Sequence, residues 1–501
     1  MLTEPRRARK GAPTTATTAT TATAAKAATT ATVAVPLGLW YDRRRACASS
    51  RYLRPLRETM VPGTIYDRLT ETCRQRGAQG AVEQLIDHLR NEKQYHELFD
   101  ALLLAGRLRL GLPAIVASGL DELPEPTRGE LETAYLSACR EVGLLLLAES
   151  RWREAWMYLR TSGDKQPMAE ALATATPDEA QLDALLEIAI HEGVCPLWGF
   201  DQVLARFGTC NALTLYDQTM HHRPRAQQQQ VAARLVAHVH AELRANLLAD
   251  IERRSAPPAA AAGHSAAAGH SAAAGHSAAA GHSAAAGHSA AAGHSAAAGH
   301  SAATEARTAT ARAANEPEGD IAPLLAGRAW LTADGAYHVD VSHLGTAVRL
   351  ARVVTDPDAL RQALDLAEYG SRLDSQYQYP GDEPFAENYP AHRLFFAAQL
   401  GEAVDEALAY FRQRAEQFPL AEYGSGPAEV YVALLTRLGR YEQALEESAR
   451  LLPRGAQTQG LAPSLLELAQ ASGRYQQLRD LCRDRDDPVG FAAGLVEPSA
   501  R

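Results

Sequence analysis

Two histidines and an aspartate near the middle of the chain could bind a metal ion. They are His338, Asp340 and His343, which lie within six residues of one another. If His338 and Asp340 belong to a strand, their side chains point to the same face. Two imidazoles and a carboxylate are the ligands of many zinc and non-haem iron sites, so one hypothesis is a metal-binding protein or metal-dependent enzyme. The alternative is that Asp340 caps a helix beginning near His343 and that the histidines have structural roles.

A second group of candidate residues is a run of tyrosines interleaved with acidic residues. Tyr377, Tyr379 and Tyr389 lie in a segment that also contains Pro and Gly. Because Tyr is enriched among the residues that dominate binding energy at protein interfaces, these three are candidate partner-binding residues. The alternative is that this segment packs as a loop over the second half of the chain.

Common catalytic motifs are absent from the sequence. There is no phosphate-binding loop, no G-x-S-x-G, no H-E-x-x-H and no dinucleotide fingerprint. We therefore expect a protein that is not an enzyme and has no cofactor, apart from the zinc or iron of the alternative hypothesis.

Helices are the elements that we expect to position these residues. Aromatic residues make up only 6% of the chain, whereas Ala and Leu are abundant, which favours helix-on-helix packing. Apolar residues recur every three or four positions from Thr64 onward, and a long helix is predicted from about Ala226 to Arg253. The exception is the segment from Trp330 to Val341, where an Asp-Gly pair between two short apolar stretches predicts a small β-hairpin.

A repeat near the C-terminus is the strongest pattern in the sequence. Gly439-Arg440-Tyr441 returns as Gly473-Arg474-Tyr475 after 34 residues. The pattern resembles the tetratricopeptide repeat, in which small residues, large residues and Pro recur within about 34 residues of a helical hairpin. The residues that carry the resemblance are Gly143, Trp152, Ala155, Pro167, Gly439, Tyr441, Ala444, Gly473 and Tyr475. The resemblance implies an all-α solenoid of stacked helical hairpins and a scaffold that binds a peptide or protein segment.

Composition divides the chain into four parts. Residues 1–59 form a Thr/Ala/Arg-rich extension that we expect to be disordered, with Met60 as the natural start, and residues 60–253 form a first helical block. Residues 254–320 contain Gly-His-Ser-Ala-Ala-Ala repeated with period six, which predicts a disordered linker because Gly opposes helix and no large apolar residue offers a core. A metal-binding role of this His-rich tract is an open alternative. Residues 321–501 combine the hairpin with a second helical block.

The charge and cysteine content narrow the class of partner. The net charge is -9, with 50 Lys and Arg against 59 Asp and Glu, which argues against a nucleic-acid partner. The six cysteines are scattered without a C-x-x-C pair, which indicates reduced thiols. No apolar stretch reaches the roughly 18 residues that a membrane span needs. We therefore expect a cytoplasmic protein that binds another protein or a peptide.

Overall fold

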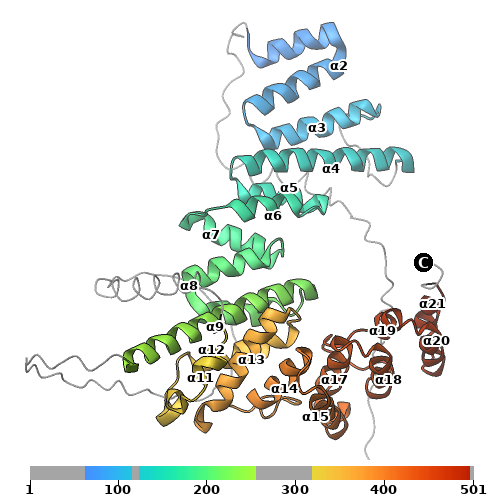
Figure 1. Ribbon diagram of the computed structural model, residues 1–501. Coiled ribbons are helices and arrows are strands. Elements are labelled where there is room, and N and C mark those ends of the chain that lie inside the picture. The colour runs from blue at the N-terminus through green and yellow to red at the C-terminus, as the bar shows by residue number, and fades with distance from the viewer. Residues whose placement is uncertain (1–62, 115–122, 256–318, 497–501) are drawn as a thin grey trace, which may run out of the picture. The chain divides into compact units, whose positions relative to one another are not determined.

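The computed structural model describes residues 63–114, 123–255 and 319–496, and every regular element in these ranges is a helix (Figure 1). The all-α prediction is therefore confirmed for this part of the chain. The predicted disordered extension, residues 1–59, lies outside the described residues, as does the predicted linker between 256 and 318. The chain separates into two compact units, residues 1–71 and 72–501. The contacts described below belong to the second unit.

The described helices follow one another along the chain. Before the undescribed segment 256–318 they are α2 (Ile65–Asn91), α3 (Tyr95–Arg109), α4 (Glu125–Ala148), α5 (Trp152–Ser162), α6 (Gln166–Thr174), α7 (Glu179–Leu186), the π-helical turn η2 (Glu187–His191), α8 (Pro196–Thr219) and α9 (Arg225–Ser255). After it come α11 (Ala322–Leu325), η3 (Ala329–Gly335), α12 (Val341–Leu350), η4 (Ala351–Val353), α13 (Pro357–Arg372), η5 (Ser375–Tyr377), α14 (Tyr389–Gln399), α15 (Val404–Gln417) and α16 (Leu420–Tyr423). The last are α17 (Gly426–Arg437), α18 (Tyr441–Leu451), α19 (Leu465–Ser472), α20 (Tyr475–Asp484) and α21 (Pro488–Val496).

Four helix pairs are joined by the same turn, and an aromatic residue begins the second helix in each. The pairs are α2–α3, α4–α5, α17–α18 and α19–α20, and the turn residues with positive φ are Lys93, Ser150, Gly439 and Gly473. In each turn, the N–H of the next residue donates to the carbonyl five positions earlier, as Arg440 does to Leu435 at 2.9 Å. This is the usual closure of a helix whose last residue is left-handed.

The predicted repeat-signature residues lie where two helices of a pair approach closely. Gly143 of α4 faces α5, and a Cβ added at this position would lie 2.7 Å from the Cγ of Leu159. Ala155 and Ala444 are fully buried at the matching position of α5 and α18. Trp152, Tyr441 and Tyr475 begin their helices, and Pro167 lies in the first turn of α6. Of these residues, Gly143 allows the close approach of α4 and α5, because a side chain at this position would overlap Leu159.

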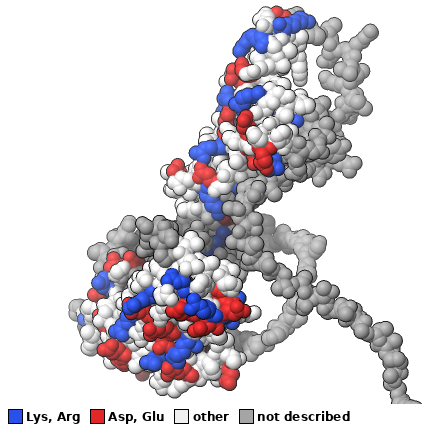
Figure 2. All heavy atoms as spheres, turned by 90° about the vertical axis from the view of Figure 1, so that its right-hand side faces the viewer, with Lys and Arg blue, Asp and Glu red and all other residues white. Residues whose placement is uncertain are grey.

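The C-terminal helices pack in chain order and exchange ion pairs between successive pairs. Contacts run from α15 to α17 and then through α18, α19, α20 and α21. Arg450 of α18 lies 3.1 Å from Glu416 of α15, and Arg474 lies 2.6 Å from Glu442. On the face turned toward the viewer in Figure 2, acidic and basic side chains alternate over these helices without forming a patch of one sign.

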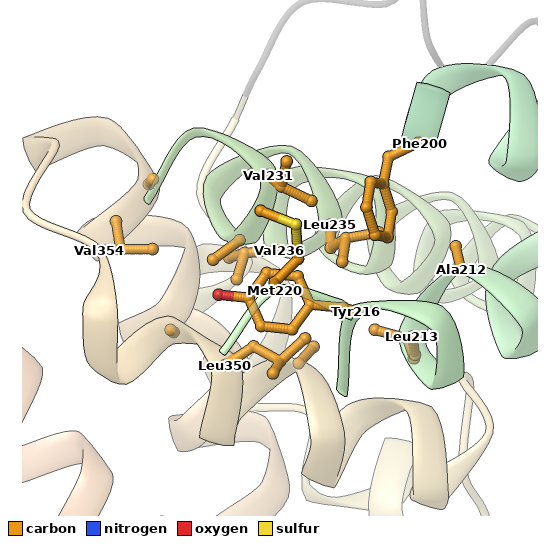
Figure 3. Packing of buried hydrophobic residues seen from close by; sticks show 14 of the residues in the cluster. Phe200, Ala212, Leu213, Tyr216, Met220, Val231, Leu235, Val236, Leu350 and Val354 are labelled. Atoms are coloured by element: carbon orange, nitrogen blue, oxygen red, sulfur yellow. The ribbon is translucent and has the colours of Figure 1, made fainter. Parts of the chain in front are cut away.

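Helix α9 joins the helices before and after the undescribed segment 256–318. It contacts α8 on one side and α12 and α13 on the other (Figure 1). In the shared core, Tyr216 of α8, Val236 of α9 and Leu350 of α12 lie around one centre (Figure 3). A buried polar contact accompanies this core, because Asp365 of α13 accepts a hydrogen bond from the backbone N–H of Ile321 at 2.7 Å and lies 2.9 Å from His240 of α9. We call this region the α9 junction.

The predicted β-hairpin between Trp330 and Val341 is wrong. The Asp-Gly turn does form, with positive φ at Asp334 and Gly335, but the residues before it form the 3-10 helix η3 and no strand occurs in the described ranges. The physical reason is that the flanking apolar residues pack into the helical core instead of against each other. Leu331 is fully buried and Val339 is 3% exposed.

Two predictions made from composition concern the cysteines and membrane-spanning segments, and the described ranges bear on both. Five of the six cysteines lie there, and all five are free thiols, among them Cys139 and Cys482 in the core. Within the same ranges, none of the helices combines the length and apolarity that crossing a bilayer requires.

Candidate partner-binding groove

A groove of about 520 Å³ lies between the C-terminal half of α9 and the segment that precedes α12. One wall is formed by the α9 residues Glu242, Asn246, Ala249, Asp250, Arg253 and Arg254. The other wall is formed by Ala336, Tyr337, His338, Val339 and Asp340. We call this the α9 groove.

The periodicity of α9 explains why these residues share one wall. Glu242, Asn246, Ala249 and Arg253 follow at intervals of three or four, which places them on one face of a helix. Another stripe of the same helix is apolar, and Leu243 and Leu247 are fully buried. The buried stripe fixes α9 in the core, and the polar face is thereby presented to the groove.

The second wall is an irregular segment with a bend at His338 and Val339, and it is held by hydrogen bonds to two helices. The backbone N–H of His338 donates to the hydroxyl of Tyr369 in α13 at 2.8 Å, and the carbonyl of His338 accepts from the side-chain amide of Asn246 at 2.7 Å. Val339 anchors the same segment in the core. The wall is therefore fixed on both sides although it belongs to no regular element.

One end of the groove carries more positive than negative charge. Asp250 is 7% exposed and lies 3.3 Å from His338 Nε2, 3.0 Å from Arg253 and 3.3 Å from Arg254. Burial alone would raise the pKa of Asp250, but the hydrogen bond from His338 and the charges of the two arginines outweigh it and lower the pKa. Arg254 also lies over the ring of Trp330, at 4.3 Å. Arg253 and Arg254 thus share the carboxylate of Asp250, and their side chains are 73% and 53% exposed.

The other end of the groove is acidic. Glu242 and Asp340 line it, and neither has a salt-bridge partner in the described part of the chain. Burial raises the pKa of Glu242 and the charge of Asp340 adds to this, although His343 and the hydroxyl of Thr209 act in the opposite direction. The hydrogen bonds that Asp340 accepts from Ser342 and His343 keep its pKa low, so a negative charge remains at this end.

The side chains of the three predicted metal ligands do not converge on one point. His338 faces Asp250 and Tyr369, whereas Asp340 accepts hydrogen bonds from the backbone N–H groups of Ser342 and His343 and caps α12. The Nδ1 of His343 is buried without a hydrogen-bond partner. Across the three described ranges, no cluster of three or more His, Cys, Asp or Glu side chains has an arrangement that could hold a metal ion.

The predicted tyrosine surface is divided by the structure. Tyr379 is 59% exposed, and Tyr377 is half-buried with its ring 5.4 Å from that of Tyr337 in an edge-to-face contact. Tyr389 is instead buried at 1% exposure and packs on Gly370, so it is not part of the exposed surface. Through Tyr337, the segment around Tyr377 reaches the α9 groove.

Sequence reasoning missed the α9 wall and Tyr337. The spacing of polar residues along the second face of α9 could have indicated the wall. The same spacing is typical of an ordinary solvent-exposed helix face. The contact between α9 and residues 336–340 joins segments that lie 92 residues apart at Asn246 and His338. No local pattern indicates such a pairing.

A smaller groove of about 270 Å³ lies between α2, α3 and α4. Its rim includes Glu83 and Glu141, which pair with Arg76 and Arg90 at 3.1 and 2.6 Å. Because its acidic residues already have cationic partners, this groove offers a ligand fewer free charges than the α9 groove does.

Searches against family models, curated proteins and solved structures found no match for this chain. A functional proposal therefore rests on the residues of the chain itself.

Proposed function

We propose that this protein is a non-enzymatic adaptor that binds an extended segment of another protein through tetratricopeptide-like helical surfaces. The observation that carries the proposal is the α9 groove, which is open, fixed on both walls and lined by an exposed tyrosine and exposed arginines. Tyr and Arg are the residue types that most often dominate binding energy at protein interfaces.

The repeated turn supports the tetratricopeptide part of the proposal. Helix pairs closed by one turn are the unit from which such arrays are built. In α5 and α18, a small buried residue also lies three positions into the second helix, at Ala155 and Ala444. Arrays of this kind commonly expose long surfaces on which an extended segment can lie.

No specific observation supports the alternative, a metal-binding protein or metal-dependent enzyme with its site at His338, Asp340 and His343. His338 is engaged with Asp250 and Tyr369, and Asp340 caps α12. These contacts are typical of an ion pair and a helix cap.

A displayed library of random peptides, selected on the full chain, tests the proposed function. We expect an enriched peptide family whose affinity falls about tenfold or more in Tyr337→Ala, because removing a central interface tyrosine commonly has an effect of that size. Tyr423→Ala is the matched control, because Tyr423 is 51% exposed and Tyr337 is 52% exposed. The proposal would be contradicted if no peptide family is enriched, or if both variants bind the enriched peptides as the wild type does.

A further inference from the structure

The α9 groove has opposite charges at its two ends. Glu242 and Asp340 lie at one end and form no ion pair with any described residue, although His343 lies near both, and Arg253 and Arg254 lie at the other end with one shared carboxylate. Asn246 and Ala249, between the two ends on α9, are uncharged. The groove therefore distinguishes one orientation of a charged ligand from the reverse orientation, which a symmetric or uniformly charged surface does not.

The length of α9 between these ends sets the length of a ligand. Glu242 and Arg253 are separated by eleven residues, which corresponds to about 16 Å along a helix axis at 1.5 Å per residue. An extended chain advances about 3.3 Å per residue, so about five residues cover this distance.

We propose that the α9 groove binds an extended segment with a Lys or Arg side chain at the Glu242 and Asp340 end and an Asp or Glu side chain about five residues away, at Arg253 and Arg254. The inference rests on the proposed function and names the chemistry of the partner. A uniformly acidic segment would be repelled at Glu242, and a uniformly basic one at the arginines, so the charge arrangement selects against both.

The conformation of the ligand follows from the shape of the groove walls. One wall is the helix α9 and the other is the irregular segment from Ala336 to Asp340, which is not itself a helix. An extended segment can follow both walls at once and place its two charged side chains at opposite ends. The small side chain of Ala249 leaves space for the ligand backbone between them.

Charge reversal at either end tests this inference on the full chain with the same displayed library. Glu242→Lys should change the enriched residue at one peptide position from basic to acidic. Arg253→Glu should change the residue about five positions away from acidic to basic, at the spacing that the helix rise sets. Arg361→Glu is the matched control for the second variant, because Arg361 is also an exposed arginine paired with an aspartate three residues earlier.

A binding measurement with one selected synthetic peptide and its charge-swapped counterpart completes the test. We expect about tenfold weaker binding of the original peptide to each reversed variant and recovery when the peptide charge facing that variant is also reversed. Glu242→Gln serves as a second variant if Glu242→Lys does not fold, and it should lose the preference for a basic residue without gaining one for an acidic residue.

The outcomes separate the two proposals. Peptides that depend on Tyr337 but ignore both charge reversals would overturn the charge arrangement and leave the adaptor function intact. Peptides whose charge preference reverses at both positions support the arrangement. The absence of any Tyr337-dependent peptide would overturn the adaptor function itself.

Discussion

The C-terminal helix pairs and the α9 junction are both built from packed helices, but they differ in where their contacts come from. In α17 to α20, each helix packs on its neighbours in the chain, and an ion pair joins Arg450 of α18 to Glu416 of α15, 34 positions earlier. At the α9 junction, His240 contacts Asp365 across 125 positions. The first region is held by many similar local contacts, whereas the second depends on a few specific contacts between distant segments.

The two regions also differ in how their charged side chains are paired. On the C-terminal helices, exposed charges are paired between successive helices. At the α9 junction, the buried side chains of His240 and Asp365 contact each other, while Glu242 in the adjoining groove forms no ion pair with another described residue. If the protein has the proposed function, a ligand would gain more from charge pairing at the α9 groove than on the C-terminal helices.

Removing the carboxylate at the centre of the α9 junction should have the largest effect on stability. We expect Asp365→Ala to lower the free energy of unfolding by about 3 kcal/mol, because it leaves the Ile321 amide and the His240 ring nitrogen buried without their acceptor. Urea unfolding measures the change. Asp358→Ala is the control on the same helix, because Asp358 is exposed and its loss should have little effect. Equal effects of the two variants would show that the junction contact is not specific.

Overpacking beside Tyr389 should have the next largest effect. A Cβ at Gly370 would lie 2.4 to 2.6 Å from three ring carbons of Tyr389, so we expect Gly370→Ala to cost about 2 kcal/mol. Gly345 faces the same tyrosine, but a Cβ there would lie at an ordinary 3.6 Å from the hydroxyl. Gly345→Ala in helix α12 should therefore be neutral or stabilise by about 0.5 kcal/mol. Thermal unfolding of the pair tests this, and a neutral Gly370→Ala would show that Tyr389 can move.

Substitutions in the repeated turn should have smaller effects of opposite sign. Gly439→Ala should destabilise by about 1 kcal/mol, because a left-handed residue with a Cβ is strained, and Ser150→Gly should stabilise by about 0.5 kcal/mol for the same reason. Both residues have φ near +60° to +70° in turns of the same kind. Chemical denaturation of both variants measures the changes, and a matching sign would mean that the two turns are not equivalent.

Neutralising Glu242 should have the smallest effect on stability. The effect should appear mainly as a change in how the free energy of unfolding depends on pH. Because burial raises the pKa of Glu242 in the folded chain, the folded state binds this proton more tightly than the unfolded state does. Its contribution to stability is therefore present below the unfolded pKa and is lost as pH rises through the folded pKa. Glu242→Gln should remove that decline and be slightly more stable than wild type at neutral pH. A decline that is unchanged in the variant would assign it to another group.

The same contrast explains which features could be predicted from the sequence. The helical class follows from three- and four-residue periodicity. Three of the repeated turns are indicated by the sequence, two by Gly439 and Gly473 and one by the match of Trp152 and Ala155 to Tyr441 and Ala444. The turn at Lys93 is not indicated, because it has no glycine and because Leu98 stands at the position of Ala155. Local pattern thus predicts a turn only where the residues in it or just after it match the repeat.

The candidate site was predicted only in part. His338, Asp340 and Tyr377 were identified by residue type, and the first two do line the α9 groove. The role of His338 depends on Asp250 and Asn246 of α9, which contact it from 88 and 92 positions away. The hairpin prediction failed for the same reason, since the local turn was correct but Leu331 and Val339 packed against distant helices.

The contact of Asp365 with the Ile321 amide bears on how the sequence between α9 and Ile321 can evolve. This contact fixes the point at which the chain returns beside α9, whatever the length of the intervening segment. For the disordered linker that composition predicts here, loop-closure free energy would grow with the logarithm of length, so losing one six-residue unit from the 63 residues between Ser255 and Gly319 would change it by only about 0.1 kcal/mol. On that prediction, selection for stability hardly constrains the number of Gly-His-Ser-Ala-Ala-Ala copies.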